Sequence, residues 1–222
     1  MMNPSKTDWK IRCVIYDCDG VLFDSLEANT KLYNDLCGLV GRDPLREEEI
    51  QYVHMHTVFE AIHFIFGKEN DLEKKALEIL KQKQVDLKNY VGYLKMEPHL
   101  FQTLEKLKEK GILRAINTNR TTSMRYIMER FNLWPYFEMV VTALDVKNPK
   151  PHPESIEKIL QECNLRKEEA VFVGDSEVDQ QTAKSSGIKF IAYKNKEIAK
   201  DAYIEDHLDL FSMIWNLNGL QR

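Results

Sequence analysis

The sequence lacks any long apolar run. Among its 222 residues no uninterrupted apolar stretch is longer than four, as in Cys13–Tyr16. A helix that crosses a bilayer needs about 20 such residues, so we expect no membrane partner. The first eight residues also lack the apolar region of a secretory signal peptide. These absences predict a cytoplasmic protein.

Cysteine is scarce, and positive charge is not in excess. The four cysteines, at positions 13, 18, 37 and 163, form no Cys-x-x-Cys pair, so we expect reduced thiols. The net charge of -4 excludes the broad basic surface typical of nucleic-acid-binding proteins. With 43% apolar and 30% charged residues, the chain is not disordered. Its length suits one large domain or a domain with an insert.

Five short apolar runs predict strands. Several are continuous in Val, Ile, Phe and Ala, which is typical of strands that are buried on both faces of a parallel sheet. Helical patterns separate the last four runs, and this alternation predicts an α/β fold with a doubly wound parallel sheet. The predicted strands are Ile11–Asp17, Ile112–Thr118, Glu138–Thr142, Ala170–Asp175 and Ile188–Tyr193.

The stretch between the first two predicted strands is too long for one crossover connection. Residues 24–97 carry only helical patterns, so we predict an inserted all-helical cap domain there. The catalytic core then consists of residues 1–23 plus 98–222. The expected helices of the insert are Asn29–Val40, Glu47–Val53, Val58–Phe66 and Leu72–Tyr90.

Polar side chains follow four of the predicted strands. In open α/β sheets, ligands bind beyond the carboxyl ends of the strands, so these side chains are expected to meet at one edge. The segments that they occupy are Asp17-Cys18-Asp19-Gly20, Asn117-Thr118-Asn119, Lys147–Pro153 and Gly174-Asp175-Ser176.

The residue types at this edge suit phosphoryl chemistry. Carboxylates at Asp17, Asp19 and Asp175 would repel one another unless a cation or shared protons intervened, and Mg²⁺ fits such oxygen ligands. Thr118 and Lys150 could stabilise the oxygens of a phosphoryl group. Each residue alone also has an ordinary explanation as a helix cap, turn or loop residue. Their arrival in order at one edge favours a shared function.

The four segments together resemble the haloacid dehalogenase-like hydrolase superfamily and, within it, the phosphoglycolate phosphatase-like group with a helical cap. Asp17 to Leu22 match its first motif, DxDG[VT]L, and Thr118 matches the second. Lys150 in Lys-Pro-His-Pro matches the third, and Gly174 to Asp179 match the fourth, GDSxxD. The resemblance covers nearly the whole chain.

The resemblance implies catalytic roles. Asp17 would attack phosphorus and carry the aspartyl-phosphate, and Asp19 would act as general acid and then as general base. Thr118, Lys150 and the backbone N–H of Asn119 would bind the phosphoryl oxygens.

The same resemblance implies a magnesium site. Asp17, Asp175 and the backbone carbonyl of Asp19 would bind Mg²⁺. Asp179 would contribute through water or from outside the inner ligands, because it lies one helical turn after Asp175.

The predicted reaction is hydrolysis of a small-molecule phosphomonoester, either phosphoglycolate-like or a sugar phosphate. Family members that cleave halides or phosphonates lack the second acid, so the presence of Asp19 favours a phosphoester. A sugar-phosphate mutase is the alternative, although Gly174 and Asn29 stand where mutases typically carry Glu and His. A non-catalytic phosphate-binding or regulatory member is a weaker alternative. A monomer and a dimer are equally compatible with the sequence.

Three further features are open to two interpretations. Glu60-Ala61-Ile62-His63 has the spacing of a metal half-site, but we expect surface or packed polar residues. Cys18 is expected to pack in the core rather than to act as a nucleophile. Arg120 could equally reach the mouth of the site or be solvated.

Overall fold

A six-stranded parallel sheet forms the centre of the protein. The computed structural model describes residues 11–56, 58–82 and 84–217. The strand order is β5-β4-β1-β6-β7-β8, which confirms the predicted α/β fold. All five predicted strands are present in this sheet, and β8 is an additional strand at its edge. The bounds are Cys13–Tyr16 for β1, Leu113–Asn117 for β4, Met139–Val141 for β5, Ala170–Gly174 for β6, Lys189–Tyr193 for β7 and Ala202–Ile204 for β8.

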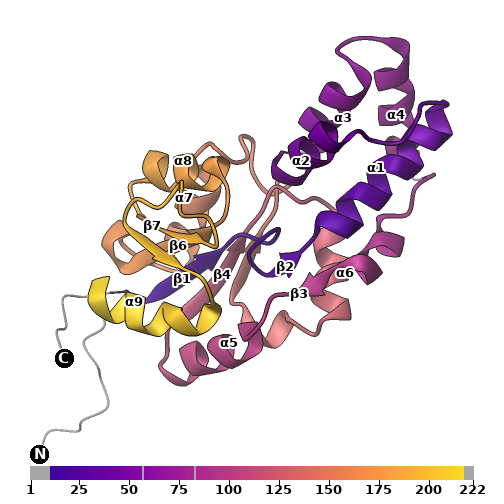
Figure 1. Ribbon diagram of the computed structural model, residues 1–222. Coiled ribbons are helices and arrows are strands. Elements are labelled where there is room, and N and C mark those ends of the chain that lie inside the picture. Colours follow the sequence, from indigo (N-terminus) through magenta and orange to yellow (C-terminus); the bar gives the residue numbers. More distant parts are fainter. Residues whose placement is uncertain (1–10, 57, 83, 218–222) are drawn as a thin grey trace, which may run out of the picture.

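Helices cover both faces of this sheet (Figure 1). Val14 and Tyr16 of β1 point into one core and Cys13 and Ile15 into the other, because successive side chains of a strand alternate. All four side chains are buried, which explains the continuous apolar run. The first core contains α5 (Leu100–Glu109), α6 (Ser123–Arg130) and α9 (Leu210–Leu217), and the second contains α7 (Glu154–Glu162) and α8 (Glu177–Ser186).

The insert leaves and rejoins the core through a short antiparallel pair, β2 (Phe23–Asp24) and β3 (Lys95–Met96). Its helices share an apolar cluster of their own and stand together at one end of the molecule (Figure 1). They are α1 (Leu26–Val40), α2 (Glu47–Met55), α3 (Val58–Phe66), α4 (Asp71–Lys81) and the 3₁₀-helix η1 (Leu87–Tyr93). Further 3₁₀-helices are η2 (Trp134–Tyr136), η3 (Lys167–Glu169) and η4 (His207–Asp209). No helix in the described ranges is long and apolar enough to span a bilayer.

The predicted helix Leu72–Tyr90 is wrong in one respect, since it comprises two elements. The buried positions of α4 are Ala76 and Ile79, and the next buried apolar residue is Val85, which is out of phase with that helical face. Polar residues occupy 81–84. Asp86 then starts η1, because its side chain accepts a hydrogen bond from the backbone N–H of Lys88.

Candidate active site

Loops at the carboxyl ends of the central strands bring the predicted residues into one pocket. Asp17 follows β1, Thr118 follows β4 and Asp175 follows β6, while Lys150 comes from the loop after β5. These four side chains line the pocket with Asp19 and Asn119, as the sequence predicted. The insert contributes further lining residues, among them Asn29, Tyr33, Val53, His56 and Tyr90.

Three carboxylates form a tight cluster in this pocket. Asp17, Asp175 and Asp179 each offer one oxygen, and these oxygens lie within 4.8 Å of one another. Burial raises the pKa of Asp17 and of Asp175, and the charge of Asp179 raises both further. A divalent cation between the carboxylates would remove this repulsion. The all-oxygen donor set therefore fits a hard metal ion.

Lys150 is the cation that already lies against this cluster. Its Nζ is 2.7 Å from Asp17 Oδ1 and 2.7 Å from Asp179 Oδ1. Burial would lower the pKa of Lys150, but the two carboxylates raise it by more, so the ammonium stays charged. The Nδ2 of Asn119 donates to the Lys150 carbonyl at 3.1 Å and fixes the loop.

Asp179 holds Lys150 from the first turn of α8. Its Oδ1 accepts from Lys150, and its Oδ2 accepts from Ser176 Oγ at 2.6 Å. Ser176 in turn caps the helix by accepting from the Asp179 backbone N–H at 3.3 Å. Because both Asp179 oxygens already have partners, an outer position relative to a metal suits this residue better than a place among its direct ligands.

The Asp19 side chain lies apart from the carboxylate cluster and pairs with Arg120. Both of its oxygens accept from the guanidinium, Oδ2 from Nε at 2.7 Å and Oδ1 from Nη2 at 2.6 Å. The Arg120 backbone N–H donates to Thr118 Oγ1 at 3.1 Å. Burial would lower the pKa of Arg120, but the neighbouring groups, Asp19 first among them, together raise it by more. Of the two interpretations of Arg120, the structure supports the one within the site.

Gly20 is required where the first motif turns away from the sheet. Its φ of +70° lies in the left-handed region, and an added Cβ would lie 1.9 Å from Asp175 Oδ2. The missing side chain thus allows the Asp17–Asp19 loop to pass directly over the Asp175 carboxylate.

Asn195 and Tyr33 are among the residues of the site that were not predicted. Asn195, in the loop after β7, donates from Nδ2 to the Asp175 carbonyl at 2.9 Å. Tyr33 of α1 is buried beside the pocket, and although burial chiefly raises its pKa, the charges of Arg120 and Asp19 also act on it. No sequence pattern marks either residue, since Asn195 is a single amide in a loop and Tyr33 belongs to an ordinary apolar stripe of a helix.

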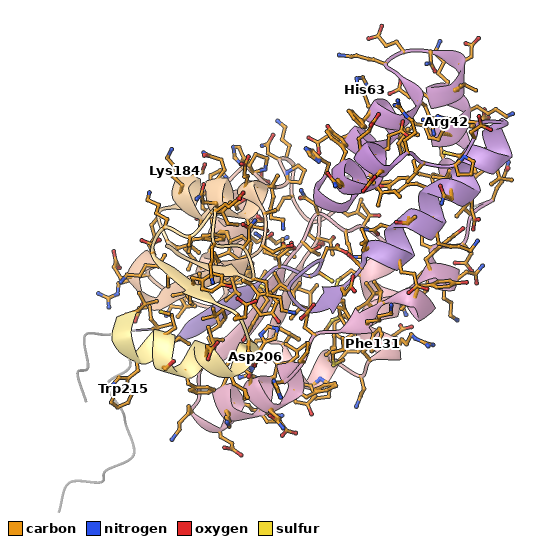
Figure 2. All side chains as sticks on the ribbon, in the orientation of Figure 1. Arg42, His63, Phe131, Lys184, Asp206 and Trp215 are labelled. Atoms are coloured by element: carbon orange, nitrogen blue, oxygen red, sulfur yellow. The ribbon has the colours of Figure 1, made fainter. Side chains whose placement is uncertain are left out.

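The other tempting residues have structural partners. Cys18 is fully buried in the core, which confirms the packing interpretation. His63 pairs with Glu73 through Nδ1 at 3.0 Å, and Figure 2 shows it among the helices of the insert and away from the sheet. His56 lines the pocket, but its Nδ1 is 2.8 Å from the Tyr52 carbonyl oxygen.

Known proteins share both the sequence pattern and the fold. The family model described as haloacid dehalogenase-like hydrolase matches residues 14–193. A phosphoglycolate phosphatase of Rhodobacter capsulatus is 26% identical over 187 residues, which are 81% of this chain and 83% of that protein. A pyrophosphatase, PpaX, of Bacillus cereus is 25% identical over 184 residues, which are 82% of this chain and 83% of that protein.

Solved structures agree. A hydrolase of the same superfamily, subfamily IA, from Geobacter sulfurreducens is 35% identical with a TM-score of 0.78, covering 95% of this chain and 99% of its own. A β-phosphoglucomutase from Clostridium difficile has a TM-score of 0.80 at 17% identity, over 94% and 97% of the chains, and shows only the shared fold.

This chain belongs to the haloacid dehalogenase-like hydrolase family. Its curated relatives include a phosphoglycolate phosphatase and pyrophosphatases, which confirms the predicted enzyme class, a phosphatase hydrolase of this family.

Proposed function

We propose that the protein is a Mg²⁺-dependent phosphatase that hydrolyses a small phosphomonoester through a phospho-aspartate at Asp17. One observation carries the proposal above all. Asp17 lies in a buried cluster with Asp175 and Asp179, in contact with the Lys150 ammonium, at the carboxyl edge of the sheet. Such an edge can hold a metal and a phosphoryl group side by side.

The chemistry divides between Asp17 and Asp19. A carboxylate oxygen of Asp17 attacks phosphorus, and the bond between phosphorus and the leaving oxygen breaks. Asp19 gives its proton to that oxygen and then takes a proton from the water that hydrolyses the aspartyl-phosphate. Phosphate leaves, and both carboxyl groups return to their starting states.

The remaining polar groups hold the transferring phosphoryl group. Lys150 supplies positive charge, the Thr118 hydroxyl supplies an O–H donor and Asn119 supplies its backbone N–H. Asp179 positions Lys150 through the 2.7 Å contact. This role explains why a carboxylate is kept at position 179 although its side chain is fully buried.

The metal would be held by the carboxylates of Asp17 and Asp175 and by the backbone carbonyl of Asp19. When bound, Mg²⁺ would neutralise the clustered carboxylates and stabilise the charge of the phosphoryl group. Asn195 orients the segment that carries Asp175, because it binds the carbonyl of that residue.

The insert, residues 24–97, would act as a cap over the core formed by residues 1–23 and 98–222. Its side chains already line the pocket that holds the carboxylates, Tyr33, His56 and Tyr90 among them. A cap in this place would exclude water from the pocket and recognise the leaving group of the substrate.

The decisive test is release of phosphate from an aryl phosphate, with and without Mg²⁺, by the wild type and by Asp17→Asn. We expect metal-dependent release in the wild type and a loss of at least about 1,000-fold in the variant, because an amide cannot form the covalent intermediate.

A matched control is Asp43→Asn, which makes the same chemical change at an exposed residue of the insert and should keep the wild-type rate. Wild-type activity in Asp17→Asn would refute the assignment of the nucleophile. Interconversion of sugar phosphates with little net release of phosphate would favour a mutase instead.

A further inference from the structure

Glu97 is a buried carboxylate at the point where the insert rejoins the sheet. It directly follows β3, and its backbone N–H donates to the carbonyl oxygen of Leu22, just before β2. Its side chain is only 8% exposed, and the single oxygen Oε2 accepts from the Tyr193 hydroxyl at 2.8 Å and from the Lys194 ammonium. A buried carboxylate is costly unless it is paired and hydrogen-bonded, so these two contacts keep Glu97 in place. It has no part in the proposed reaction.

Both partners of Glu97 belong to one turn at the end of β7. Tyr193 is the last residue of this strand and Lys194 is the next residue, so in an extended chain their side chains would point to opposite faces. The left-handed φ of 54° at Lys194 interrupts this alternation, and both side chains end on the same carboxylate oxygen. A residue with a side chain rarely adopts such a φ unless its surroundings hold it there. Glu97 therefore stabilises a turn that the backbone alone does not favour.

The same turn brings Asn195 to the segment that carries Asp175. Asn195 directly follows Lys194, and its Nδ2 donates to the Asp175 carbonyl at 2.9 Å, while its Oδ1 accepts from the backbone N–H of Glu197 at 3.2 Å. The amide is thus held at both of its ends. Since the Asp175 carboxylate belongs to the acidic cluster, a shift of the turn would displace one of the candidate metal ligands.

The path from Glu97 to Asp175 runs outside the pocket. Among the described residues, those that line the pocket include neither Glu97 nor the turn 193–195. These groups therefore act on the site through the main chain of Asp175, as the outer partners of metal ligands do in other proteins.

We propose that Glu97 is a positioning residue for the metal site: it holds the turn after β7 in place, and that turn holds the main chain of Asp175 through Asn195. The proposal rests on the metal-dependent function proposed for the protein. The affinity for Mg²⁺ then depends on a residue at the junction between the insert and the sheet, although this residue contacts neither the metal nor the substrate.

Binding of Mg²⁺ without substrate, measured by titration calorimetry on the full chain, tests the proposal. We expect Asn195→Ala to raise the dissociation constant at least about 10-fold, as is typical of outer partners of metal ligands. Glu97→Gln should raise it at least about 3-fold, but should add little when combined with Asn195→Ala, because residues that act in one chain of contacts are not additive. In hydrolysis of an aryl phosphate, Glu97→Gln should need more Mg²⁺ and regain most of the wild-type kcat at saturation.

Glu169→Gln is the matched control. Glu169 directly precedes β6 and so lies at the opposite end of that strand from Gly174; its side chain is 12% exposed and pairs with Arg12. The change removes a carboxylate that is shielded to a similar degree and should leave the affinity for Mg²⁺ unchanged. Lys194→Gln breaks the same pair as Glu97→Gln from its 41% exposed side, and should weaken Mg²⁺ binding even if Glu97→Gln does not fold.

Wild-type affinity for Mg²⁺ in both Glu97→Gln and Lys194→Gln would overturn the proposal. An equal loss of affinity in Glu169→Gln would also overturn it, since the effect would then come from a general loosening of the fold. Full additivity of Glu97→Gln and Asn195→Ala would show that Glu97 does not act through Asn195. A wild type that binds Mg²⁺ but hydrolyses no phosphate ester would instead refute the phosphatase function alone.

Discussion

At the scale of single residues, His207 shows how a buried polar group holds the loop of the first motif, Asp17 to Leu22. Its Nε2 lies 2.8 Å from the carbonyl oxygen of Val21, so Nε2 carries the proton and donates it. The ring stacks on Tyr193 at 4.6 Å, and within the described chain Nδ1 has no hydrogen-bond partner. Burial lowers the pKa of His207, while the bond to Val21 and the charges of Glu97 and Asp206 oppose that shift only in part.

This histidine predicts a pH dependence of stability. Its folded-state pKa lies below the ordinary value of 6.5. At a pH between the folded-state pKa and 6.5, the unfolded chain therefore binds more protons than the folded protein. The free energy of unfolding consequently falls as the pH decreases through this range. The contribution is fully present above about pH 6.5 and is lost as the pH falls through the folded-state pKa. Urea unfolding at several pH values should show a smaller loss in His207→Gln, which keeps a donor for Val21.

An equal loss of stability in the wild type and in His207→Gln would contradict this account, because other histidines would then carry the effect. His99→Gln is a suitable control, because it makes the same chemical change at a histidine that pairs with Asp206 at 2.7 Å and is half exposed rather than buried. The two variants should not give the same profile.

The sequence could predict the site where a side chain follows a buried strand or belongs to a family motif, as Lys150 and Asp179 do. Asp17, Thr118 and Asp175 come directly after continuous apolar runs, and the topology of a parallel sheet brings such positions together. The partnership of Arg120 with Asp19 depends on the direction of a long flexible side chain, for which the sequence has no pattern. The contribution of Asn195 depends on a loop in which Lys194 adopts a left-handed φ of 54°.

At the scale of elements, the contact between β6 and α8 is set by Gly174. An added Cβ would lie 2.3 Å from the Cβ of Asp179, which means that helix and strand approach more closely than any side chain would allow. This approach places Asp179 on Lys150 and leaves Asp179 with no exposed surface. The geometry of the carboxylate cluster is therefore a property of the helix–strand packing as well as of the acids themselves.

Gly174→Ala should accordingly shift α8, with an expected destabilisation of about 1–3 kcal/mol, as for other overpacked sites. Phosphatase activity should fall by more than the loss of folded protein accounts for, because Asp179 would no longer contact Lys150. Gly38→Ala is the matched change, since a Cβ there meets nothing within 4 Å and Gly38 lies in the exposed face of α1. It should stabilise the protein by up to about 1 kcal/mol. Thermal unfolding and steady-state rates should be measured for both variants. Equal effects of Gly174→Ala and Gly38→Ala would refute the role of the close contact between β6 and α8.

Elements with strong periodicity were predictable and short ones were not. Helix α3 has the expected bounds, Val58–Phe66, because four of its side chains are buried on one stripe. Strand β8 has only three residues, of which Ile204 alone is buried, so no apolar run marks it. β2 and β3 have two residues each and exist through their pairing with one another, which depends on contacts distant in the sequence.

At the scale of the whole molecule, the protein contains apolar cores on the two faces of the sheet and a separate one inside the insert. Leu104 of α5 belongs to a sheet core and Leu36 of α1 to the insert, and both side chains are fully buried. The same Leu→Ala substitution can therefore be made in each core, at two leucines that are equally buried.

We expect Leu36→Ala and Leu104→Ala to cost about 2–5 kcal/mol each but to loosen different parts. In hydrogen exchange, Leu36→Ala should speed the amides of α1–α4 and leave β6 protected. Leu104→Ala should speed α5 and the strands beneath it, because local opening follows cooperative units. If both variants gave the same exchange pattern, the insert and the sheet would have to be one cooperative unit.

The pairing of β2 with β3 has a consequence for how the protein can vary. Phe23 lies opposite Met96, so the chain enters and leaves the insert at neighbouring positions, and the order of the parallel strands does not depend on what lies between them. The entropic cost of closing a loop grows by only about 0.6 kcal/mol for each doubling of its length. Substitutions, insertions and even exchange of the insert therefore place little strain on the sheet, and substrate preference can diverge while the phosphoryl-transfer chemistry stays fixed.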